Sequence, residues 1–415
     1  MRTDQPATDL AVRPLRVAMV GTRGVPAHYG GFETAVEEIG QRLAARGHEV
    51  TVYCRTRPGE ERLDNYLGMR LVHLPAVRSK SLETLGHTAL SAAHMSFSSR
   101  HDAAIVFNAA NAPFVPVLQA RGVPTAVHVD GLEWKRAKWG GLGRHYYRMA
   151  EALAVRWADA LIADARGIAD YYAEEFGAQT ELLTYGAPIQ TDPAADRLPE
   201  LGLQPGRYHL VVARFEPENH VEEIVLGYHR SAARQPLVVV GSAPYADEYT
   251  ARIERIAEAD DRIRLLGGVW DQTQLDQLYA NALTYLHGHS VGGTNPSLLR
   301  AMGAGAAVLA YDVVFNREVL GADGEFFADP DDVTARVMEA ERDPERAFEA
   351  GDRLRESAGT RYRWDDVAAG YEELLGRLAT RRCIRGAASG RRNQRDAAPE
   401  VIRPAAPRVE AGARR

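Results

Sequence analysis

The stretch HGHSVGGTNPSLLRAMGAGAAVLAYD, residues 287–312, decides the fold of this chain. It follows an apolar run typical of a strand and passes through a glycine-rich turn. A helix is then predicted to begin near Asn295, because Pro296 suits the first helical turn, where its missing N–H is not needed. Free backbone N–H groups at such a helix start, together with the helix dipole, favour a bound anion. Since no Gly-Lys-Ser/Thr follows, the loop is not a P-loop, and we expect another kind of site for the phosphates of a nucleotide.

Length and composition limit the classes of protein to consider. With 415 residues, of which 45% are hydrophobic, the chain can bury two cores of ordinary size. A net charge of −6 and a pI near 6.1 argue against nucleic acid as a partner. Cys54 and Cys383 lie far apart and form no metal or redox motif, so we expect a reducing compartment, the cytoplasm. No apolar run reaches the ~18 residues of a membrane span, and no cluster has metal-ligand spacing, so we expect neither a spanning helix nor a metal or other cofactor.

Strand and helix patterns alternate along both halves of the chain. The first half begins with a strand over 16–20, a glycine-rich loop, a helix over 32–46 and a strand over 49–54, which together predict a βαβ unit with a right-handed crossover. The further strands expected in this half span 69–74, 103–107, 125–129 and 160–163. The strands expected in the second half span 209–213, 237–240, 263–266, 283–286 and 307–311. Its helices are expected over 222–233, 245–259 and 274–281.

These patterns predict the domain organisation. The fold class is α/β, with two tandem Rossmann-like domains facing a central cleft, which is the usual place for a ligand. A linker rich in Pro, Gly and Asp, residues 184–206, separates them. We expect a flexible N-terminus at 1–15, the two domains at 16–190 and 205–360, a terminal helix crossing back to the first domain at 361–380, and a disordered Arg-, Ala- and Pro-rich tail at 381–415.

Four motifs occur in a fixed order: GTRGVPAHYGGFET (21–34), VDGLEWKRAKW (129–139), ARFEPENH (213–220) and GGTNPSLLRAMGAG (292–305). Together they resemble the GT-B glycosyltransferases of family 4, and in particular the bacterial rhamnosyltransferase-like branch that helps build capsule and exopolysaccharide. The resemblance implies a retaining transferase that moves a hexosyl unit, L-rhamnose from a dTDP-sugar, to a hydroxyl of a lipid-linked glycan precursor. A family-4 transferase using a UDP- or GDP-hexose, and a catalytically degenerate scaffold in a polysaccharide assembly complex, remain as alternatives.

The resemblance assigns roles to residues of the first domain. Asp130 follows an apolar strand, so it is expected to face the cleft, and it and His128 would contact the transferred sugar and the acceptor as catalytic residues. The alternative for Asp130 is an acid capping a turn. Gly30 and Gly31 would let the backbone approach the donor diphosphate or the acceptor, with Glu33 beside them. The alternative for this loop is a tight turn that needs positive φ.

In the second domain the resemblance implies donor-binding residues. Arg214 and Asn219 would contact the diphosphate, although Asn219 stands where the family has a charged Lys. The alternative for Arg214 is a surface salt bridge. Glu318 would lie near the donor, or would be a carboxylate at a helix start. The other donor-binding candidates are Gly292, Gly293, Thr294, Asn295 and Ser297.

Arg300 departs from the family pattern, which has a Glu there to hold the ribose hydroxyls. Arg reverses the charge and cannot accept those hydrogen bonds. Three explanations stay open: another group holds the ribose while Arg300 pairs with a carboxylate or a phosphate, donor binding is weaker, or activity is reduced or lost.

A run of aromatic and cationic residues lies between the second motif and the following helix. Its composition suits the surface of an anionic membrane, where a lipid-linked acceptor would be found, so peripheral association with the inner face of the cell membrane is expected. The alternative is a solvated helix whose long side chains reach the solvent. The run consists of Trp134, Lys135, Arg136, Lys138, Trp139, Arg144, Tyr146, Tyr147 and Arg148.

Overall fold

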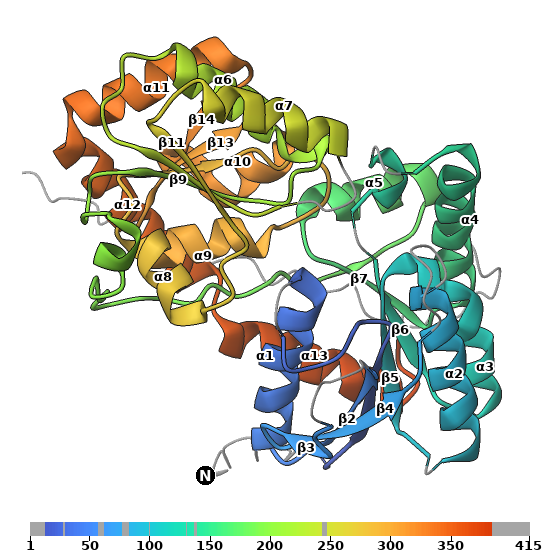
Figure 1. Ribbon diagram of the computed structural model, residues 1–415. Helices are drawn as coiled ribbons and strands as arrows, with labels where there is room; N and C mark the ends of the chain where they lie inside the picture. The colour runs from blue at the N-terminus through green and yellow to red at the C-terminus, as the bar shows by residue number, and fades with distance from the viewer. Residues whose placement is uncertain are drawn as a thin grey trace, which may run out of the picture.

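The computed structural model has two α/β halves, each built on its own sheet (Figure 1). The structure describes residues 13–27, 30–56, 62–76, 83–98, 100–129, 131–136, 139–242 and 247–383. All neighbouring strands pair in parallel except one antiparallel pair at an edge of the first sheet. The predicted α/β class with two Rossmann-like domains is therefore confirmed.

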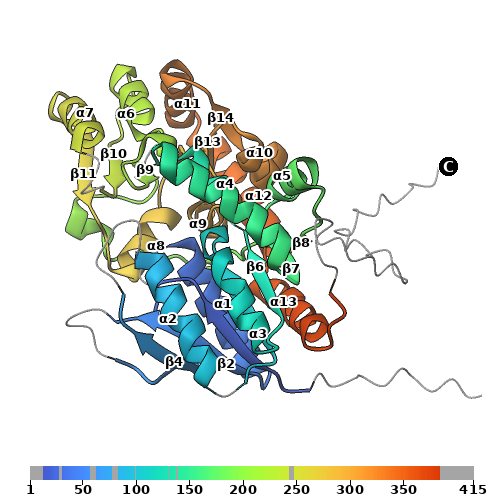
Figure 2. The ribbon, with the colours of Figure 1, turned by 90° about the vertical axis from the view of Figure 1, so that its right-hand side faces the viewer.

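The first sheet is formed by β1 (Arg16–Val20), β2 (Glu49–Arg55), β3 (Asn65–Tyr66), β4 (Met69–Leu74), β5 (Ala103–Phe107), β6 (Thr125–His128), β7 (Ala160–Ala163) and β8 (Glu181–Leu182). Their order across the sheet is β3-β4-β2-β1-β5-β6-β7-β8. Alternate residues of β1 face opposite layers: Met19 packs with α1 (Gly31–Ala45) and α13 (Trp364–Ala379), whereas Ala18 packs with α2 (Glu83–Phe97), α3 (Val115–Ala120) and α4 (Gly141–Trp157). Figure 2 shows the second layer from its outer side.

The second sheet is formed by β9 (His209–Val212), β10 (Leu237–Val240), β11 (Ile263–Gly267), β12 (Thr284–His287), β13 (Ala307–Tyr311) and β14 (Glu325–Phe327), in the order β11-β10-β9-β12-β13-β14. One face is covered by α6 (Val221–Arg230), α7 (Asp247–Glu258) and α11 (Pro330–Arg342). The other face is covered by α8 (Gln272–Ala280), α9 (Pro296–Ala304) and α12 (Pro344–Arg361).

The sequence predicts most strands within one residue. Strands β1, β4, β5, β7, β10 and β13 begin and end at the predicted residues, and β2, β6, β9, β11 and β12 differ by one residue at one or both ends. The short strands β3, β8 and β14 were not predicted, because two or three residues are too few to show a period. The expected tail lies outside the described residues from position 384, and the expected flexible N-terminus lies outside them up to position 12.

Helix α13, which ends the described chain, packs against the first domain. Arg42 of α1 and Arg46, the C-cap of that helix, form ion pairs of 2.9 and 2.8 Å with Asp365 and Glu372 of α13. The ring of His48, just after α1, lies 2.9 Å from the same Glu372. The chain therefore passes from the first domain into the second, completes the second sheet and returns to the first domain through α13. The two domains are thus connected by the chain twice.

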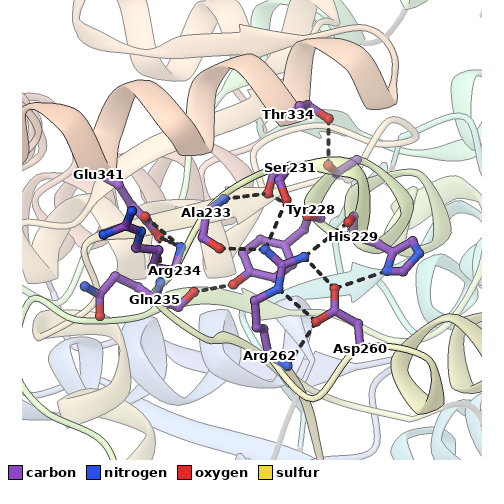
Figure 3. A network of polar contacts seen from close by, with 11 residues as sticks. Tyr228, His229, Ser231, Ala233, Arg234, Gln235, Asp260, Arg262, Thr334 and Glu341 are labelled. Carbon is purple, nitrogen blue, oxygen red and sulfur yellow. Dashed lines mark hydrogen bonds and ion pairs between the residues drawn. The ribbon is translucent and has the colours of Figure 1, made fainter.

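A polar network holds two turns of the second domain together (Figure 3). The guanidinium of Arg262 pairs with Asp260 at 2.6 Å and donates hydrogen bonds to the carbonyls of His229, Ser231 and Ala233. The hydrogen bonds from Arg262 lower the pKa of Asp260 to about 2. Every charge of this network therefore meets an opposite charge or a carbonyl within the same domain.

Candidate active site

Each sheet has a point at which successive helices pass to opposite faces. In the second sheet it lies between β9 and β12, because α6 packs on one face and α9 on the other. In the first sheet it lies between β1 and β5, with α1 and α3 on opposite faces. Ligands of open α/β sheets bind at such points, outside the carboxyl ends of the strands. The loops at 213–220 and 288–295, which hold two of the four motifs, flank this point in the second domain.

The carboxyl ends of the two sheets approach each other closely at the glycines of three motifs. A methyl group on Gly31, at the start of α1, would lie 3.2 Å from Cγ of Pro296 at the start of α9. A methyl group on Gly131 would lie only 2.3 Å from Cα of Gly292. Gly292 also has a φ of +133°, which side chains disfavour. The absence of side chains at these positions lets the two backbones meet.

The start of α9 is held by its own side chains. Asn295 is the N-cap, and its Oδ1 accepts a 2.9 Å hydrogen bond from the N–H of Ser297. The hydroxyl of Ser297 lies 2.6 and 2.7 Å from the hydroxyls of Tyr279 and Tyr285, inside the second domain. The predicted donor-binding side chains of Asn295 and Ser297 are thus engaged within the protein, which leaves anion binding at this helix start to the backbone.

Two further predicted donor residues contact the first domain. The hydroxyl of Thr294 donates a 2.7 Å hydrogen bond to the carbonyl of Asp164. The carboxylate of Glu318, on α10 (Val314–Leu320), accepts hydrogen bonds of 3.0 and 3.4 Å from the N–H groups of Arg166 and Gly167, the first residues of α5 (Arg166–Phe176). Glu318 therefore acts as a carboxylate at a helix start, on a helix of the other domain.

Two arginines from different domains meet at a buried carboxylate. Arg214 lies 3.3 Å and Arg136 lies 3.8 Å from Oε2 of Glu216, which is 3% exposed. Arg136 also forms a 2.7 Å ion pair with Glu133. Burial and the positive charges of Arg136 and Arg214 keep the pKa of His289, in the fourth motif's loop, well below its ordinary value. Two arginines, one from each domain, are therefore brought together beside the loop that precedes α9, and each is paired with a carboxylate.

Asn219 joins the loops of the third and fourth motifs. Its Nδ2 donates a 2.8 Å hydrogen bond to the carbonyl of Arg214, and its Oδ1 lies 2.7 Å from Nδ1 of His289. The next residue, His220, has a φ of +46° and stacks its ring on Tyr311 at 3.7 Å. The geometry makes Asn219 a residue that positions Arg214, while its contact with a donor stays a prediction.

The structure surrounds His128 with aromatic rings. The imidazole is fully buried and stacks between Phe107 and Tyr185, with ring centroids 5.6 and 6.1 Å away, while Phe32 meets it edge-on at 5.1 Å. Burial lowers the pKa of His128 to about 3, so the ring is neutral at physiological pH and a weak proton acceptor. The other predicted catalytic residue, Asp130, lies outside the described residues.

The first glycine loop folds back on the carboxylate of Glu33. Oε1 of Glu33 accepts a 3.1 Å hydrogen bond from the N–H of Arg23, and Oε2 would lie 2.2 Å from a methyl group on Gly30. Gly30 is the N-cap of α1 and has a φ of +117°. The requirement for positive φ, considered as an alternative for this loop, is present at Gly30, whereas the close approach of Gly31 to Pro296 places the loop at the domain boundary.

Comparison with known protein families divides the chain into two matched parts. Residues 200–358 match the family described as "Glycosyl transferases group 1", and residues 15–188 match "Domain of unknown function (DUF1972)". The second domain is thus similar to glycosyltransferase group 1 domains. Its match covers both the loop that contains Arg214 and the loop at the start of α9, whereas Arg136 lies in the part that matches the other family.

Curated relatives and solved structures agree with this class. A stretch of 132 residues is 30% identical to the O-antigen chain mannosyltransferase B of Escherichia coli, and 122 residues are 30% identical to the UDP-N-acetylglucosamine-peptide N-acetylglucosaminyltransferase GtfA subunit of Streptococcus gordonii. These stretches cover 31% and 28% of this chain, and only 34% and 23% of those proteins. The fold is similar to that of a sucrose-phosphate synthase from Thermosynechococcus elongatus, with a TM-score of 0.77 and 20% identity over 88% of this chain and 100% of that one. It is also similar to Anabaena HepE in complex with UDP-glucose, with a TM-score of 0.72 and 14% identity over 87% and 99%. The chain therefore has the GT-B fold.

Arg300 of the second domain pairs with a carboxylate. Its Nη2 lies 2.7 Å from Oδ1 of Asp276, its Nη1 donates a 3.0 Å hydrogen bond to Gln272, and the guanidinium lies 5.5 Å from the ring centroid of Tyr279. Both partners of its hydrogen bonds are on α8. Arg300 therefore pairs with a carboxylate, as the first of the three explanations includes, while the group that holds the ribose and the effect on donor binding stay predictions.

The aromatic and cationic run does not form one exposed surface. The prediction is wrong for Arg136, whose side chain is only 13% exposed because it is paired with Glu133 and Glu216. Trp139 donates a 3.2 Å hydrogen bond to Glu133 and packs on Tyr147, and Lys138 lies outside the described residues. In the part of the chain that the structure describes, no helix is long and apolar enough to cross a bilayer, and no three His, Cys, Asp or Glu side chains gather as metal ligands.

Sequence reasoning missed two residues at the domain boundary, Arg136 and Asp164. Arg136 was assigned to the membrane surface, because nothing local to its motif indicates a partner in the other domain. Asp164 directly follows the apolar strand β7, which is the same signal that singled out Asp130. Its side chain is buried, and burial raises its pKa to about 7.

Proposed function

We propose that this protein is a retaining glycosyltransferase that moves a hexosyl unit from a nucleotide-sugar to a hydroxyl of a lipid-linked glycan precursor. The observation that carries the proposal is the convergence of two arginines, Arg214 and Arg136, beside the helix start of α9, where the two domains meet. A nucleoside diphosphate is the ligand that such a place suits.

The proposed chemistry does not require a side chain to act as a general acid or base. As the bond between sugar and diphosphate loosens toward an oxocarbenium-like state, negative charge grows on the diphosphate, and one of its oxygens can take the acceptor proton. The protein then has to stabilise that charge, which is the role we give to Arg214 and to the backbone at the start of α9. A neutral, buried His128 fits this scheme, because the scheme needs no proton from the imidazole.

The donor is proposed to be dTDP-L-rhamnose, on the strength of the four motifs. A UDP- or GDP-hexose is the second candidate. The mannosyltransferase relative and the fold shared with a protein solved with UDP-glucose favour this second candidate. Its pyrophosphate would bind the same cations, so the two candidates differ only in the contacts to base and sugar.

Association with an anionic membrane is proposed to involve the layer formed by α2, α3 and α4. Phe97 and Leu142 are 92% and 90% exposed there. The acidic residues of these three helices are Glu83, which pairs with Arg55, and the buried Glu151, so the helices themselves offer the exposed cations little opposing charge, although Arg148 pairs with Glu175 of α5 at 2.8 Å. The exposed cations are Arg121, Arg144, Arg148 and Arg156.

The function is tested by incubating the purified protein with dTDP-rhamnose, UDP-glucose and GDP-mannose and measuring release of the nucleoside diphosphate without acceptor. Release from one donor, and its loss in Asp130→Asn with nucleotide affinity retained, is the expected result. A folded protein that neither binds nor cleaves any of the three would contradict the proposal and favour the scaffold alternative.

Membrane binding is tested by co-sedimentation with anionic vesicles. Leu142→Ser combined with Arg144→Glu should weaken binding, and raised salt should do the same. Trp270→Ser, an exposed aromatic on the second domain, is the matched control, and a chain ending near residue 378 tests the tail. If only the truncation removes binding, the layer is not the membrane surface.

A further inference from the structure

Asp164 has a surrounding unlike that of the other acid beside strand β7. Asp159 precedes the strand, and its Oδ2 accepts hydrogen bonds from the N–H of Thr125 at 2.9 Å and from Gln119 at 3.0 Å. Asp164 follows the strand, is 5% exposed, and its Oδ1 has no hydrogen-bond partner among the residues that the structure describes. Burying a carboxyl group without a partner is unfavourable, so this position needs an explanation.

Capping of the next helix does not explain why the carboxyl group of Asp164 is buried. Helix α5 begins at Arg166, its N-cap is Ala165, and its first N–H groups are already bonded by Glu318 from the second domain. The carbonyl of Asp164 is bonded by Thr294, but this contact uses the backbone and would persist with any side chain. The carboxyl group receives backbone hydrogen bonds from Asp164 and Thr294, but its Oδ1 has no hydrogen-bond partner in the described part of the molecule.

The carboxyl group points at the loop that precedes α9. A methyl group on Gly293 would lie 1.9 Å from Oδ1 of Asp164, so the oxygen occupies the space that a side chain at position 293 would need and lies directly against the loop. Two residues further on, Asn295 caps α9, the helix start to which the proposed function assigns the diphosphate. A sugar attached to that diphosphate and extending toward the first domain would meet Asp164.

We propose that the carboxyl group of Asp164 is a sugar-binding group, which forms a hydrogen bond with a hydroxyl of the transferred sugar while the nucleoside diphosphate rests on the second domain. This inference rests on the proposed function. Carboxylates suit the task, because each oxygen accepts hydrogen bonds from hydroxyl groups, and a hydroxyl supplies the partner that Oδ1 lacks. Asp164 would then select sugars by the position of a hydroxyl group. It belongs to the first domain, whereas the nucleotide would bind the second.

The test compares a nucleoside diphosphate with its nucleotide-sugar by calorimetric titration into wild type, Asp164→Asn and Asp164→Ala. UDP with UDP-glucose, GDP with GDP-mannose and dTDP with dTDP-rhamnose are the pairs. In both variants the affinity for the nucleoside diphosphate should stay within about threefold, whereas the affinity for the nucleotide-sugar that wild type accepts should fall by about 10- to 100-fold. Asp159→Asn is the matched control, since it should lower the melting temperature and leave the ratio of the two affinities unchanged.

Three other outcomes would overturn the inference in different ways. An unchanged ratio in both Asp164 variants means that the carboxyl group does not touch the donor sugar. An equal loss for nucleotide and nucleotide-sugar means that Asp164 supports the nucleotide site or the docking of the domains. If instead the wild type binds no nucleoside diphosphate at all, the proposed function itself fails, and this result is separate from any behaviour of the variants.

Discussion

The Arg262 network and the domain boundary both contain buried charges, but they differ in how completely the acids are hydrogen-bonded. Around Arg262, one guanidinium meets one carboxylate and three carbonyls, all within the second domain (Figure 3). At the boundary, Asp164 is buried with an oxygen that has no partner among the described residues, and Arg136 and Arg214 converge on one carboxylate. Networks of the first kind stabilise a fold, whereas polar groups left unmatched are typical of sites that bind a ligand.

The same contrast separates the roles of the two domains. The network joins the turn after α6 to the turn before β11 by hydrogen bonds. It therefore stabilises the second sheet, which carries the proposed nucleotide site. The boundary groups come from loops of both domains and contact one another across the boundary. We therefore expect substitutions in the network to change stability, and substitutions at the boundary to change binding and pH dependence.

The largest expected effect is the pH dependence that Asp164 causes. The folded protein keeps the proton of this carboxyl group up to about pH 7, whereas the unfolded chain releases it near the ordinary value of 3.8. Between these values the folded state binds more protons, so the free energy of unfolding falls as pH rises. Asp164→Asn removes this dependence, and its stability relative to wild type should rise by up to about 4 kcal/mol between pH 4 and pH 7.

Urea unfolding of both proteins at several pH values measures this difference. Glu318 and Tyr371, whose charges interact with Asp164, are present in both proteins, so their own titration largely cancels in the comparison. A difference in stability that is constant across the range would show that Asp164 is not a buried acid of raised pKa.

Arg262→Ala should destabilise the second domain by about 3 kcal/mol, because it removes the cation that pairs with the buried carboxylate of Asp260 and the donor to three carbonyls. Thermal unfolding followed by circular dichroism measures the change. Affinity for a nucleoside diphosphate, measured below the melting transition, should stay within about threefold. A loss of affinity without loss of stability would place the network in the binding site and remove the contrast drawn above.

A smaller effect is expected at Arg300. Arg300→Glu places a second carboxylate beside Asp276 and should destabilise the domain by about 1 kcal/mol. Combining it with Asp276→Arg reverses the ion pair and should recover most of the loss, as a double-mutant cycle of unfolding free energies would show. Nucleotide affinity should change little in the double variant. Tighter nucleotide binding in Arg300→Glu alone would instead support a weakened ribose site at this position.

The sequence predicts the repeated strand and helix pattern of this fold well. The apolar strands and the Gly, Pro and Asn residues around α9 act locally, so their positions follow from neighbouring residues. Very short edge strands such as β14 carry too little pattern to be predicted, because pairing with a longer neighbour forms them.

The candidate site is less predictable, because its contacts join distant loops. The motif containing Arg136 indicates an amphipathic surface when considered alone, and only folding brings Glu216 of the other domain to it. The sequence identifies Ser297 as part of a helix start but gives no sign that its hydroxyl turns toward Tyr285. A charged residue after a buried strand is a usable signal, and applied consistently it would have identified Asp164 together with Asp130.

The central claim is that the boundary binds a nucleoside diphosphate through Arg214. The direct measurement is calorimetric titration of UDP, GDP and dTDP into wild type, Arg214→Ala and Arg230→Ala. Arg230 is the matched control, since it is a half-exposed arginine of the same domain that is paired with an acid, Asp331, away from the boundary. We predict that wild type and Arg230→Ala bind one of the three nucleotides alike and that Arg214→Ala binds it about 10- to 100-fold more weakly. Equal affinity in all three proteins would contradict the claim.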